Sequence, residues 1–159
     1  MATDRRPRKR AASSHPRSVS VTARRTPVRK NTKATKAKAP RTSKPGKVPA
    51  DVKLAVAAAR DKKAEHLHVL DLRKGSAFTD FFIIATGTNI RQVQAIADGI
   101  EESLKKIGMR PALVEGYARA EWILLDYFDF IVHVFTPATR EFYGLERLWG
   151  DAERIEVSA

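Results

Sequence analysis

The chain contains no cysteine among its 159 residues. Disulfide bonds, thiol catalysis and cysteine-ligated zinc are therefore excluded, and the composition fits a reducing compartment. No apolar run approaches the roughly 18 to 20 residues that a membrane-spanning helix needs. The N-terminus also lacks the apolar core, roughly 7 to 15 residues long, of a secretory signal. We accordingly expect a cytoplasmic protein that makes no membrane contact.

Acidic residues are nearly absent from the first 49 positions, which hold 16 Lys/Arg and a single acid, a net charge of +15. Residues 50–159 hold 14 basic and 17 acidic residues, so their net charge is −3, and the whole chain has a formal charge of +12. The charge distribution predicts a basic tail over residues 1–49 and a mildly acidic domain over residues 50–152. A short C-terminal tail, residues 153–159, completes the predicted organisation.

Aromatic residues are also missing from the basic tail, whereas proline occurs in it six times. Such a segment buries too little apolar surface to offset the entropy of ordering, so we expect it to be disordered. Clustered cations bind nucleic acid through counterion release, which predicts contact with RNA. The cations expected to make it are Arg5, Arg6, Arg8, Lys9, Arg10, Arg24 and Arg25. A solvated linker and an organellar transit peptide are the alternatives, although these prolines oppose the amphipathic helix of a transit peptide.

Apolar spacing and helix signals predict eight elements in the domain. They are a helix at 51–62, strands at 66–72 and 80–85, a helix at 90–107, strands at 112–116, 122–126 and 130–135, and a helix beginning at 137. Strand 80–85 is apolar on both faces, which favours a central position. The order predicts an α/β fold in which helices pack on a mixed β-sheet of about five strands.

The ends of the two later helices carry specific signals. Asn89 is placed to cap the helix at 90–107 through its side-chain oxygen, with Gln92 reaching back toward the helix start. Thr136 is the expected cap of the last helix, with proline at its first position. The buried stripe expected for that last helix consists of Phe142, Leu145, Leu148 and Trp149.

The Thr-Gly-Thr-Asn corner before the long helix has the form of a phosphate-binding turn. A phosphate at a helix start is physically permitted. Neither Gly-x-Gly-x-x-Gly nor Gly-Lys-Ser/Thr accompanies the corner, however. Gly87 and Asn89 both have structural explanations, the first as a flexible corner and the second as a cap. We therefore interpret the corner as structural.

A second catalytic pattern is incomplete. Nucleotidyltransferases place a Gly-Ser turn before an Asp-x-Asp/Glu pair whose carboxylates hold two magnesium ions. Here Gly75-Ser76 precedes Asp80, but Phe82 stands where the second carboxylate is needed, and an aromatic ring cannot ligate magnesium. We expect no enzyme, no cofactor and no metal site. A nucleotidyltransferase or nucleotide hydrolase using Gly75-Ser76, Asp80 and residues 86–88 stays open as an alternative.

The histidines provide no complete site either. His66 and His68 alternate along a strand and could face one metal ion, but no third ligand accompanies them. Solvated or capping roles are the simpler interpretation. His133 lies within an apolar strand, where a hydrogen-bonded core histidine is expected.

The segment "EWILLDYFDFIVHVF", residues 121–135, predicts a β-hairpin with an unusual turn. Turns normally carry Gly, Asn, Asp or Ser, yet this one places two aromatic residues between carboxylates. Aromatic side chains are enriched in binding hot spots, and acidic neighbours favour a basic protein partner. Burial of the same rings in the core is the alternative. The predicted partner-binding residues are Glu115, Trp122, Asp126, Tyr127, Phe128 and Asp129.

Two long stretches, "LHVLDLRKGSAFTDFFIIATGTNIRQVQAIADGI" and "EG…WILLDYFDFIVHVFTPATREFYGLERLW", resemble the ribosomal silencing factor (Iojap) family. The resemblance runs from about Lys53 to Trp149. Its specificity comes from many short motifs in order. They are Thr79-Asp80, the Ala-Thr-Gly-Thr turn, Arg91-Gln92-Val93, Ile96-Ala97-Asp98, Glu115-Gly116, Trp122, Asp126, His133 and Arg140 through Trp149.

The resemblance implies an α/β domain related to nucleotidyltransferases but without their activity. It also implies binding to the large ribosomal subunit through ribosomal protein L-fourteen. Such binding sterically prevents the small subunit from joining, so that translation falls when nutrients are scarce. Some family members form homodimers, organellar relatives assist assembly of the large subunit, and a bacterial-type member acts in the cytoplasm.

The chain departs from the family pattern at three places. Phe128 stands at the hairpin tip, where the family usually has glycine, which changes the freedom of the turn and adds bulk. Asn89 replaces the usual serine and preserves capping. The basic tail lies outside the resemblance. A third hypothesis is a general RNA-binding protein that binds through this tail.

Overall fold

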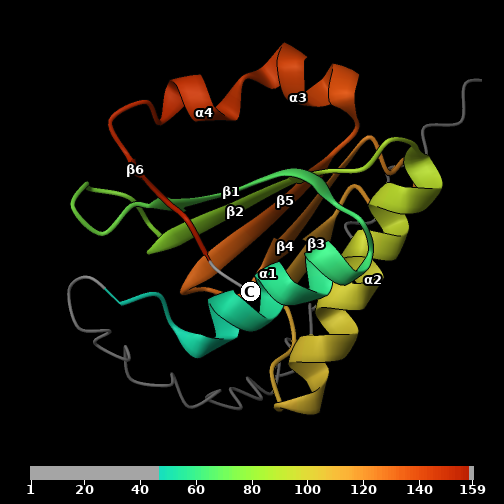
Figure 1. The fold of residues 1–159 in the computed structure, drawn as a ribbon, viewed down its shortest axis with the longest axis horizontal. Coiled ribbons are helices and arrows are strands. Elements are labelled where there is room, and N and C mark those ends of the chain that lie inside the picture. Colours follow the sequence, from blue (N-terminus) through green and yellow to red (C-terminus); the bar gives the residue numbers. More distant parts are fainter. Residues whose placement is uncertain (1–46, 158–159) are drawn as a thin grey trace, which may run out of the picture. The chain divides into compact units, whose positions relative to one another are not determined.

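The computed structural model describes residues 47–157, in which a β-sheet lies between two helical layers (Figure 1). The predicted disorder and RNA contacts of the basic tail, from Arg5 to Arg25, fall on residues outside this range. In the part that is described, no helix is long and apolar enough to cross a membrane.

Helices and strands follow the predicted order closely. In chain order they are α1 (Ala50–Asp61), β1 (Glu65–Asp71), β2 (Phe81–Thr86), α2 (Ile90–Lys106), β3 (Leu113–Glu115), β4 (Trp122–Asp126), β5 (Phe130–Phe135), α3 (Pro137–Tyr143), α4 (Leu145–Leu148) and β6 (Glu153–Ile155). The predicted α/β class and mixed sheet are confirmed.

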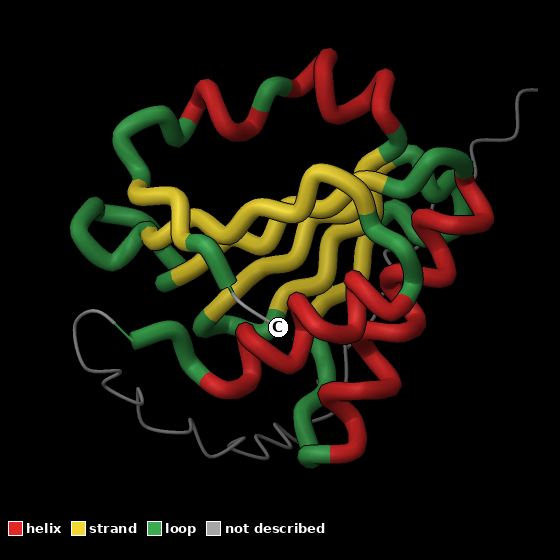
Figure 2. Tube along the Cα trace, viewed as in Figure 1, coloured by secondary structure: helices red, strands yellow, loops and turns green. Residues whose placement is uncertain are grey.

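The sheet has the strand order β3-β4-β5-β2-β1-β6. Figure 2 shows its strands as one layer between the helices. β2 and β5 pair in parallel at its centre, and every other pair is antiparallel. All six residues of β2 are buried, as expected for a strand covered on both faces.

A sixth strand, β6, extends the predicted sheet of about five strands and lies within residues 153–159, the predicted C-terminal tail. β6 pairs with β1, with Val69 opposite Ile155. Beyond it, the Val157 carbonyl accepts a hydrogen bond of 2.5 Å from the Arg60 guanidinium, and the Val157 side chain is buried. A strand of three residues is too short to show a periodic pattern, so the sequence carried no signal for it.

One face of the sheet is covered by α1 and α2, which pack against each other as well as against the strands (Figure 1). The core on this side is almost wholly apolar and includes Phe81, Ile83, Ile123, Phe130 and Val132. The apolar spacing predicts a buried stripe on the long helix α2 from Ile90 to Ile107. Val93, Ile96, Ala97, Ile100 and Leu104 are buried, whereas Ile90 and Ile107 at the two ends are exposed.

The other face is covered by α3 and α4, and here the predicted continuous helix was wrong. The chain takes a left-handed conformation at Gly144, with φ of 53°, which separates the two short helices. The break rotates the expected stripe, so that Leu145 is buried but Phe142 is 80% exposed and Leu148 is also exposed. Thr136 does not cap through its side chain, which instead lies 2.8 Å from the Thr139 hydroxyl.

The Thr-Gly-Thr-Asn corner has the structural role predicted for it. Asn89 Oδ1 accepts the Gln92 N–H at 3.0 Å, and the Gln92 side chain accepts both the N–H and the hydroxyl of Thr88. A Cβ on Gly87 would lie 2.8 Å from the backbone nitrogen of Val93, so only glycine allows this close approach. The N–H and hydroxyl of Thr88 and the N–H of Gln92 thus have acceptors within the chain.

Candidate docking surface

The six predicted partner-binding residues do not form one patch. Trp122 and Asp126 lie on β4, on the face that also carries α3 and α4, and Glu115 lies opposite Leu124 on the neighbouring strand. Phe128 and Asp129 are exposed at the tip of the β4–β5 hairpin. Tyr127 lies beneath that tip, on the side of α1 and α2.

Tyr127 was wrongly expected at the surface, because only 4% of it is exposed. Its ring stacks on Phe130 with the centroids 5.0 Å apart, and its hydroxyl has no hydrogen-bond partner among residues 47–157. Burial raises the pKa of this hydroxyl above its usual value. Of the two aromatic residues at the turn, one therefore completes the core and the other faces solvent.

Trp122 is half-buried and held from several directions. Its indole N–H donates a hydrogen bond of 3.1 Å to Nδ1 of His133. Its ring stacks on Phe135 at 5.1 Å, and the ring of Tyr143 from α3 lies 4.7 Å away. These contacts fix the orientation of the indole while part of it stays accessible.

His133 is the buried, hydrogen-bonded histidine that the sequence predicted. Because Nδ1 accepts from the Trp122 indole, the ring proton lies on Nε2, which has no partner in the core. Burial lowers the pKa of this imidazole to about 4. His133 is therefore neutral near pH 7 and available as the acceptor that Trp122 needs.

Three further residues extend this face, and sequence reasoning missed them. Leu124 points to the same side of β4 as Trp122 and is half-buried, whereas Tyr143 and Phe142 are exposed and touch each other edge-on at 5.1 Å. Phe142 was assigned to the core because its spacing fits a helical stripe; Gly144, a residue type that commonly ends helices, was the signal of the break. We call Trp122, Leu124, Asp126, Phe142 and Tyr143 together the Trp122 surface.

Carboxylates border the Trp122 surface, as the sequence predicted. Glu115, Glu121 and Asp129 are exposed, and Asp126 is partly exposed. Glu121 pairs with Arg119 at 3.0 Å in an exposed ion pair, which contributes little binding energy to either partner. The rim is thus electronegative beside exposed aromatic rings, a combination suited to a basic protein surface.

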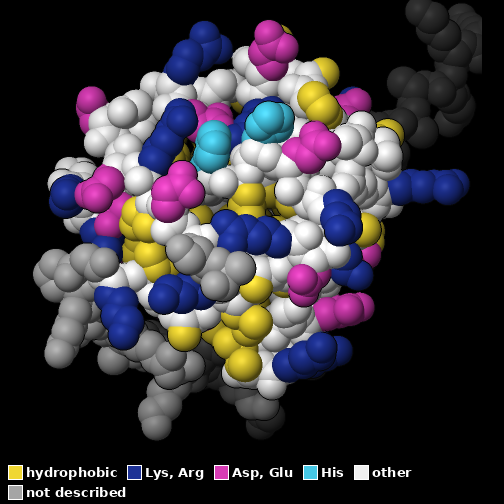
Figure 3. All heavy atoms as spheres, in the orientation of Figure 1, with side chains coloured by type: hydrophobic (Ala, Val, Ile, Leu, Met, Phe, Trp, Pro, Cys, Tyr) yellow, Lys and Arg dark blue, Asp and Glu magenta, His cyan; other side chains and the backbone are white. Residues whose placement is uncertain are grey.

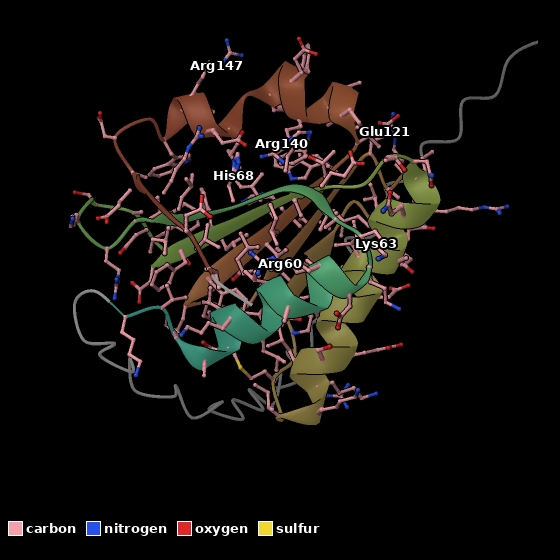
Figure 4. The ribbon with its side chains drawn as sticks, viewed as in Figure 1. Arg60, Lys63, His68, Glu121, Arg140 and Arg147 are labelled. Carbon is pink, nitrogen blue, oxygen red and sulfur yellow. The ribbon has the colours of Figure 1, made fainter. Side chains whose placement is uncertain are left out.

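A cavity of about 590 Å³ opens between β1 and the α3–α4 layer, and Arg140 is one of the residues that line it. Arg140 donates to the His66 carbonyl at 2.6 Å, to the Thr86 hydroxyl at 2.6 Å and to the Glu146 carboxylate. Figure 4 shows Arg140 and His68 together between the sheet and these helices. Because the guanidinium already has a full set of acceptors, the cluster ties α3 and α4 to the sheet.

His66 and His68 have no metal-binding arrangement around them. Within residues 47–157, no three His, Asp or Glu side chains lie close enough together to hold an ion. Burial and the nearby Arg140 lower the pKa of His68. Figure 3 shows this side of the molecule as a mosaic of basic and acidic side chains around the histidines, without a large patch of one sign.

The position of the second carboxylate in the nucleotidyltransferase pattern is occupied by a core residue. Phe82 lies in β2, buried on the α3–α4 side, with its ring 4.8 Å from that of His133 and 5.4 Å from that of Trp149. Asp80 precedes the strand, and its N–H donates to the Asp129 carbonyl at 3.0 Å. A carboxylate in place of Phe82 would be buried in this aromatic layer, where desolvation disfavours its charge.

Comparisons with known proteins agree with the motifs. The family model described as "Ribosomal silencing factor during starvation" matches residues 45–159. The chain is 42% identical over 106 residues to the ribosomal silencing factor of Halalkalibacterium halodurans, covering 67% of this chain and 91% of the relative. A more distant relative, the mouse protein named "Mitochondrial assembly of ribosomal large subunit protein 1", is 28% identical and is matched over 45% of its length.

A crystal structure from Chromobacterium violaceum matches with a TM-score of 0.62 and 36% identity, covering 69% of this chain and 90% of that one. The sheet and helices described above are therefore shared with a solved protein at substantial sequence identity. Together with the family model, which spans all of the described residues, these similarities show that the chain belongs to the ribosomal silencing factor family.

Proposed function

We propose that this chain is a non-enzymatic factor that binds the large ribosomal subunit and sterically blocks joining of the small subunit, which represses translation when nutrients are scarce. The contact is ribosomal protein L-fourteen, the partner implied by the family resemblance. The Trp122 surface, with Glu115 and Asp129 at its margin, supplies the docking site. The observation that carries the proposal is the fixed, half-exposed indole of Trp122 beside carboxylates.

The physical argument rests on pre-organisation. An aromatic side chain that is already immobilised loses little conformational entropy when a partner covers it. The Trp122 indole is held by His133, Phe135 and Tyr143 before any partner arrives. The acidic margin attracts a basic ribosomal protein and repels bare RNA, which supports a protein rather than a nucleic acid as the contact.

The absence of catalysis follows from Phe82 in this proposal. With one carboxylate and no second acid on the strand, the two-metal reaction of nucleotidyltransferases has no place to occur. Calorimetry with magnesium and nucleoside triphosphates tests this point. Magnesium-dependent nucleotide binding would favour the enzyme instead.

Co-sedimentation with purified large subunits tests the docking surface. We expect Trp122→Ala together with Asp126→Ala to abolish binding, because the first removes the central anchor and the second removes a charge beside it. Ile107→Ala, at an exposed apolar position at the end of α2, is the matched control and should bind normally. Circular dichroism melting of each variant checks folding. Unchanged binding of the folded double variant would move the interface elsewhere.

The basic tail is proposed to act as an additional arm on ribosomal RNA. If roughly 6 to 10 of its cations meet phosphates, their share of affinity falls by about 10³ to 10⁵ between 50 and 200 mM salt. Replacing the cluster from Arg5 to Arg10 and the pair Arg24-Arg25 with glutamine should flatten this salt dependence. An identical salt slope in the glutamine variant would refute the arm.

A role in assembly of the large subunit is the second candidate function, and the name of the mouse relative favours it. Sucrose gradients separate the two functions. An anti-association factor shifts purified subunits from the joined to the separate peaks, whereas an assembly factor changes the abundance of mature large subunits in cells. Homodimer formation and a bacterial-type cytoplasmic location stay predictions.

A further inference from the structure

The tip of the β4–β5 hairpin has an unusual backbone for the residue it carries. Asp129 N–H donates to the Tyr127 carbonyl two residues earlier, at 2.9 Å, and Phe128 between them has φ of 68°. A hydrogen bond of this span around a positive φ defines a classic γ-turn, which is rare and strained. Bulky side chains are genuine outliers in this region of conformational space, whereas glycine enters it at little cost.

Packing of the Phe128 ring within the described residues does not offset this strain. The side chain is 74% exposed, and no ring contact to it is made within the described part of the chain. The backbone around it is held by others: its N–H donates to Asp126 Oδ1 at 2.8 Å, and its carbonyl accepts from the Thr79 hydroxyl at 3.0 Å. Strain that the surrounding structure enforces, at a residue directed to solvent, points to recognition rather than stability.

A second exposed ring lies in the loop that braces this turn. Phe78 is 77% exposed and precedes Thr79, the residue that binds the Phe128 carbonyl. The next residue, Asp80, donates its N–H to Asp129. The β1–β2 loop and the hairpin tip are therefore bonded together at one end of the sheet, and each presents a phenylalanine to solvent.

Acidic side chains accompany these rings. Asp126 and Asp129 flank the tip, and Asp80 follows Phe78 within two residues. The nearby basic residues Arg73 and Lys74 pair with Asp71 at 2.6 Å and with Glu153 at 2.7 Å, and Arg73 also lies near Asp80. The carboxylates of Asp71, Asp80, Asp126, Asp129 and Glu153 still outnumber these two cations. The same region already shows a guanidinium on an aromatic face, with Arg73 4.7 Å from the Phe81 ring centroid.

We propose that Phe78 and Phe128, with Asp80, Asp126 and Asp129, form a second docking point, the tip site, for an arginine- or lysine-rich protein segment. The rings supply apolar and cation–π contacts, and the carboxylates supply charge complementarity. The partner segment belongs to a basic protein of the large subunit, and to that extent the inference rests on the proposed function. The tip site shares Asp126 with the Trp122 surface but adds the Phe78 and Phe128 rings, which contribute affinity beyond that of the Trp122 indole.

The test uses the full chain, labelled with ¹⁵N, and a deca-arginine peptide as probe. Amide shifts should concentrate at residues 78–80 and 126–129 on titration. Phe128→Gly should weaken peptide binding by about two- to fivefold, the equivalent of one exposed cation–π contact. Phe78→Ala should have a similar effect, and Ile107→Ala should have none.

Thermal melting supplies the readout that a merely structural role would not give. Phe128→Gly removes the strain, so its Tm should not fall and the weaker binding cannot result from unfolding. Shifts spread over other regions, or equal peptide affinity of Phe128→Gly and the native chain, would overturn the tip site. A ten-nucleotide RNA that produces the same shifts would overturn the protein partner.

Large-subunit binding distinguishes this inference from the proposed function. Phe128→Gly should bind subunits severalfold more weakly, whereas Trp122→Ala should lose binding altogether. If the Trp122 variant binds normally and the Phe128 variant does not, the Trp122 surface fails while the tip site survives. If the native chain ignores large subunits but the peptide result holds, the proposed function fails and the tip site needs another basic partner.

Discussion

The two faces of the sheet differ in what covers them and in how completely. The face under α1 and α2 is closed by two packed helices, the longer of 17 residues, over an aliphatic and aromatic core. The face under α3 and α4 is covered by helices of seven and four residues, and α3 buries none of its side chains. The second face contains the His133–Trp122 pair and the Arg140 cluster and leaves part of β4 accessible.

This difference assigns separate tasks to the two faces. Apolar burial without polar interruption is the main source of folding free energy, and it is concentrated on the closed face. Polar groups in a partly open layer contribute less to stability but fix the orientation of side chains that a partner can reach. Substitutions should therefore affect stability strongly on one face and binding strongly on the other.

The largest effect is expected from a truncation on the closed face. Phe130→Ala removes a ring that is fully buried and stacked on Tyr127, and should lower the free energy of unfolding by about 3 to 5 kcal/mol. Urea denaturation followed by circular dichroism measures the loss. A change below about 1 kcal/mol would show that this face does not dominate stability.

Acidic pH should lower the free energy of unfolding through protonation of His133 on the open face. In the folded chain the pKa of this imidazole is about 4, against 6.5 for an unperturbed histidine, so between these values only the unfolded state binds the proton. Stability therefore falls as the pH falls from 6.5 to 4, by about 3 kcal/mol in total.

His68, whose pKa is also lowered, adds a loss of the same sign. Urea denaturation of the native chain and of His133→Gln between pH 4 and 6.5 isolates the contribution of His133. The glutamine carbonyl can still accept the hydrogen bond from Trp122, but glutamine does not titrate. Parallel pH curves for the two proteins would contradict the assignment.

A smaller effect is expected where α2 begins. Asn89→Ala removes the side-chain acceptor of the Gln92 N–H and should cost about 1 kcal/mol. Asn89→Ser, which restores a capping oxygen, should recover most of this loss. Thermal melting of both variants measures the difference, and equal melting temperatures for alanine and serine would mean that the cap does not contribute.

The smallest stability effect and a clear binding effect should coincide at Phe142. This ring is mostly exposed on α3, so Phe142→Ser should change the free energy of unfolding by less than about 0.5 kcal/mol. The same change should weaken co-sedimentation with large subunits, because it removes apolar area from the Trp122 surface. A stable variant with native binding would remove Phe142 from the docking surface.

The sequence predicted the closed face well because its signals are local and periodic. The buried stripe of α2 repeats over about three turns, and Asn89 and Gly108 lie just beyond the two ends of the helix. Strand β2 was placed correctly because an apolar run of its length fits only a strand covered on both faces. Family motifs in these elements agreed with the same assignment.

The open face was harder to predict because long-range packing decides it. Phe142 has the spacing of a core residue, and only the left-handed Gly144 turns it outward. Tyr127 and Phe128 are adjacent aromatic residues, and the positive φ of the second determines which one is buried. β6 depends on pairing with β1, more than 80 residues earlier in the chain, and no local pattern reports that contact.

A single amide, that of Gln92, joins the two helices of the closed face. Its Nε2 donates to the carbonyls of Lys62 and Lys63, just after the end of α1, while its Oε1 accepts from Thr88, just before the start of α2. Fraying of one helix terminus therefore releases the partner groups of the other. We expect α1 and α2 to exchange their amide hydrogens as one cooperative unit, with a shared opening free energy, instead of as two independently fluctuating segments.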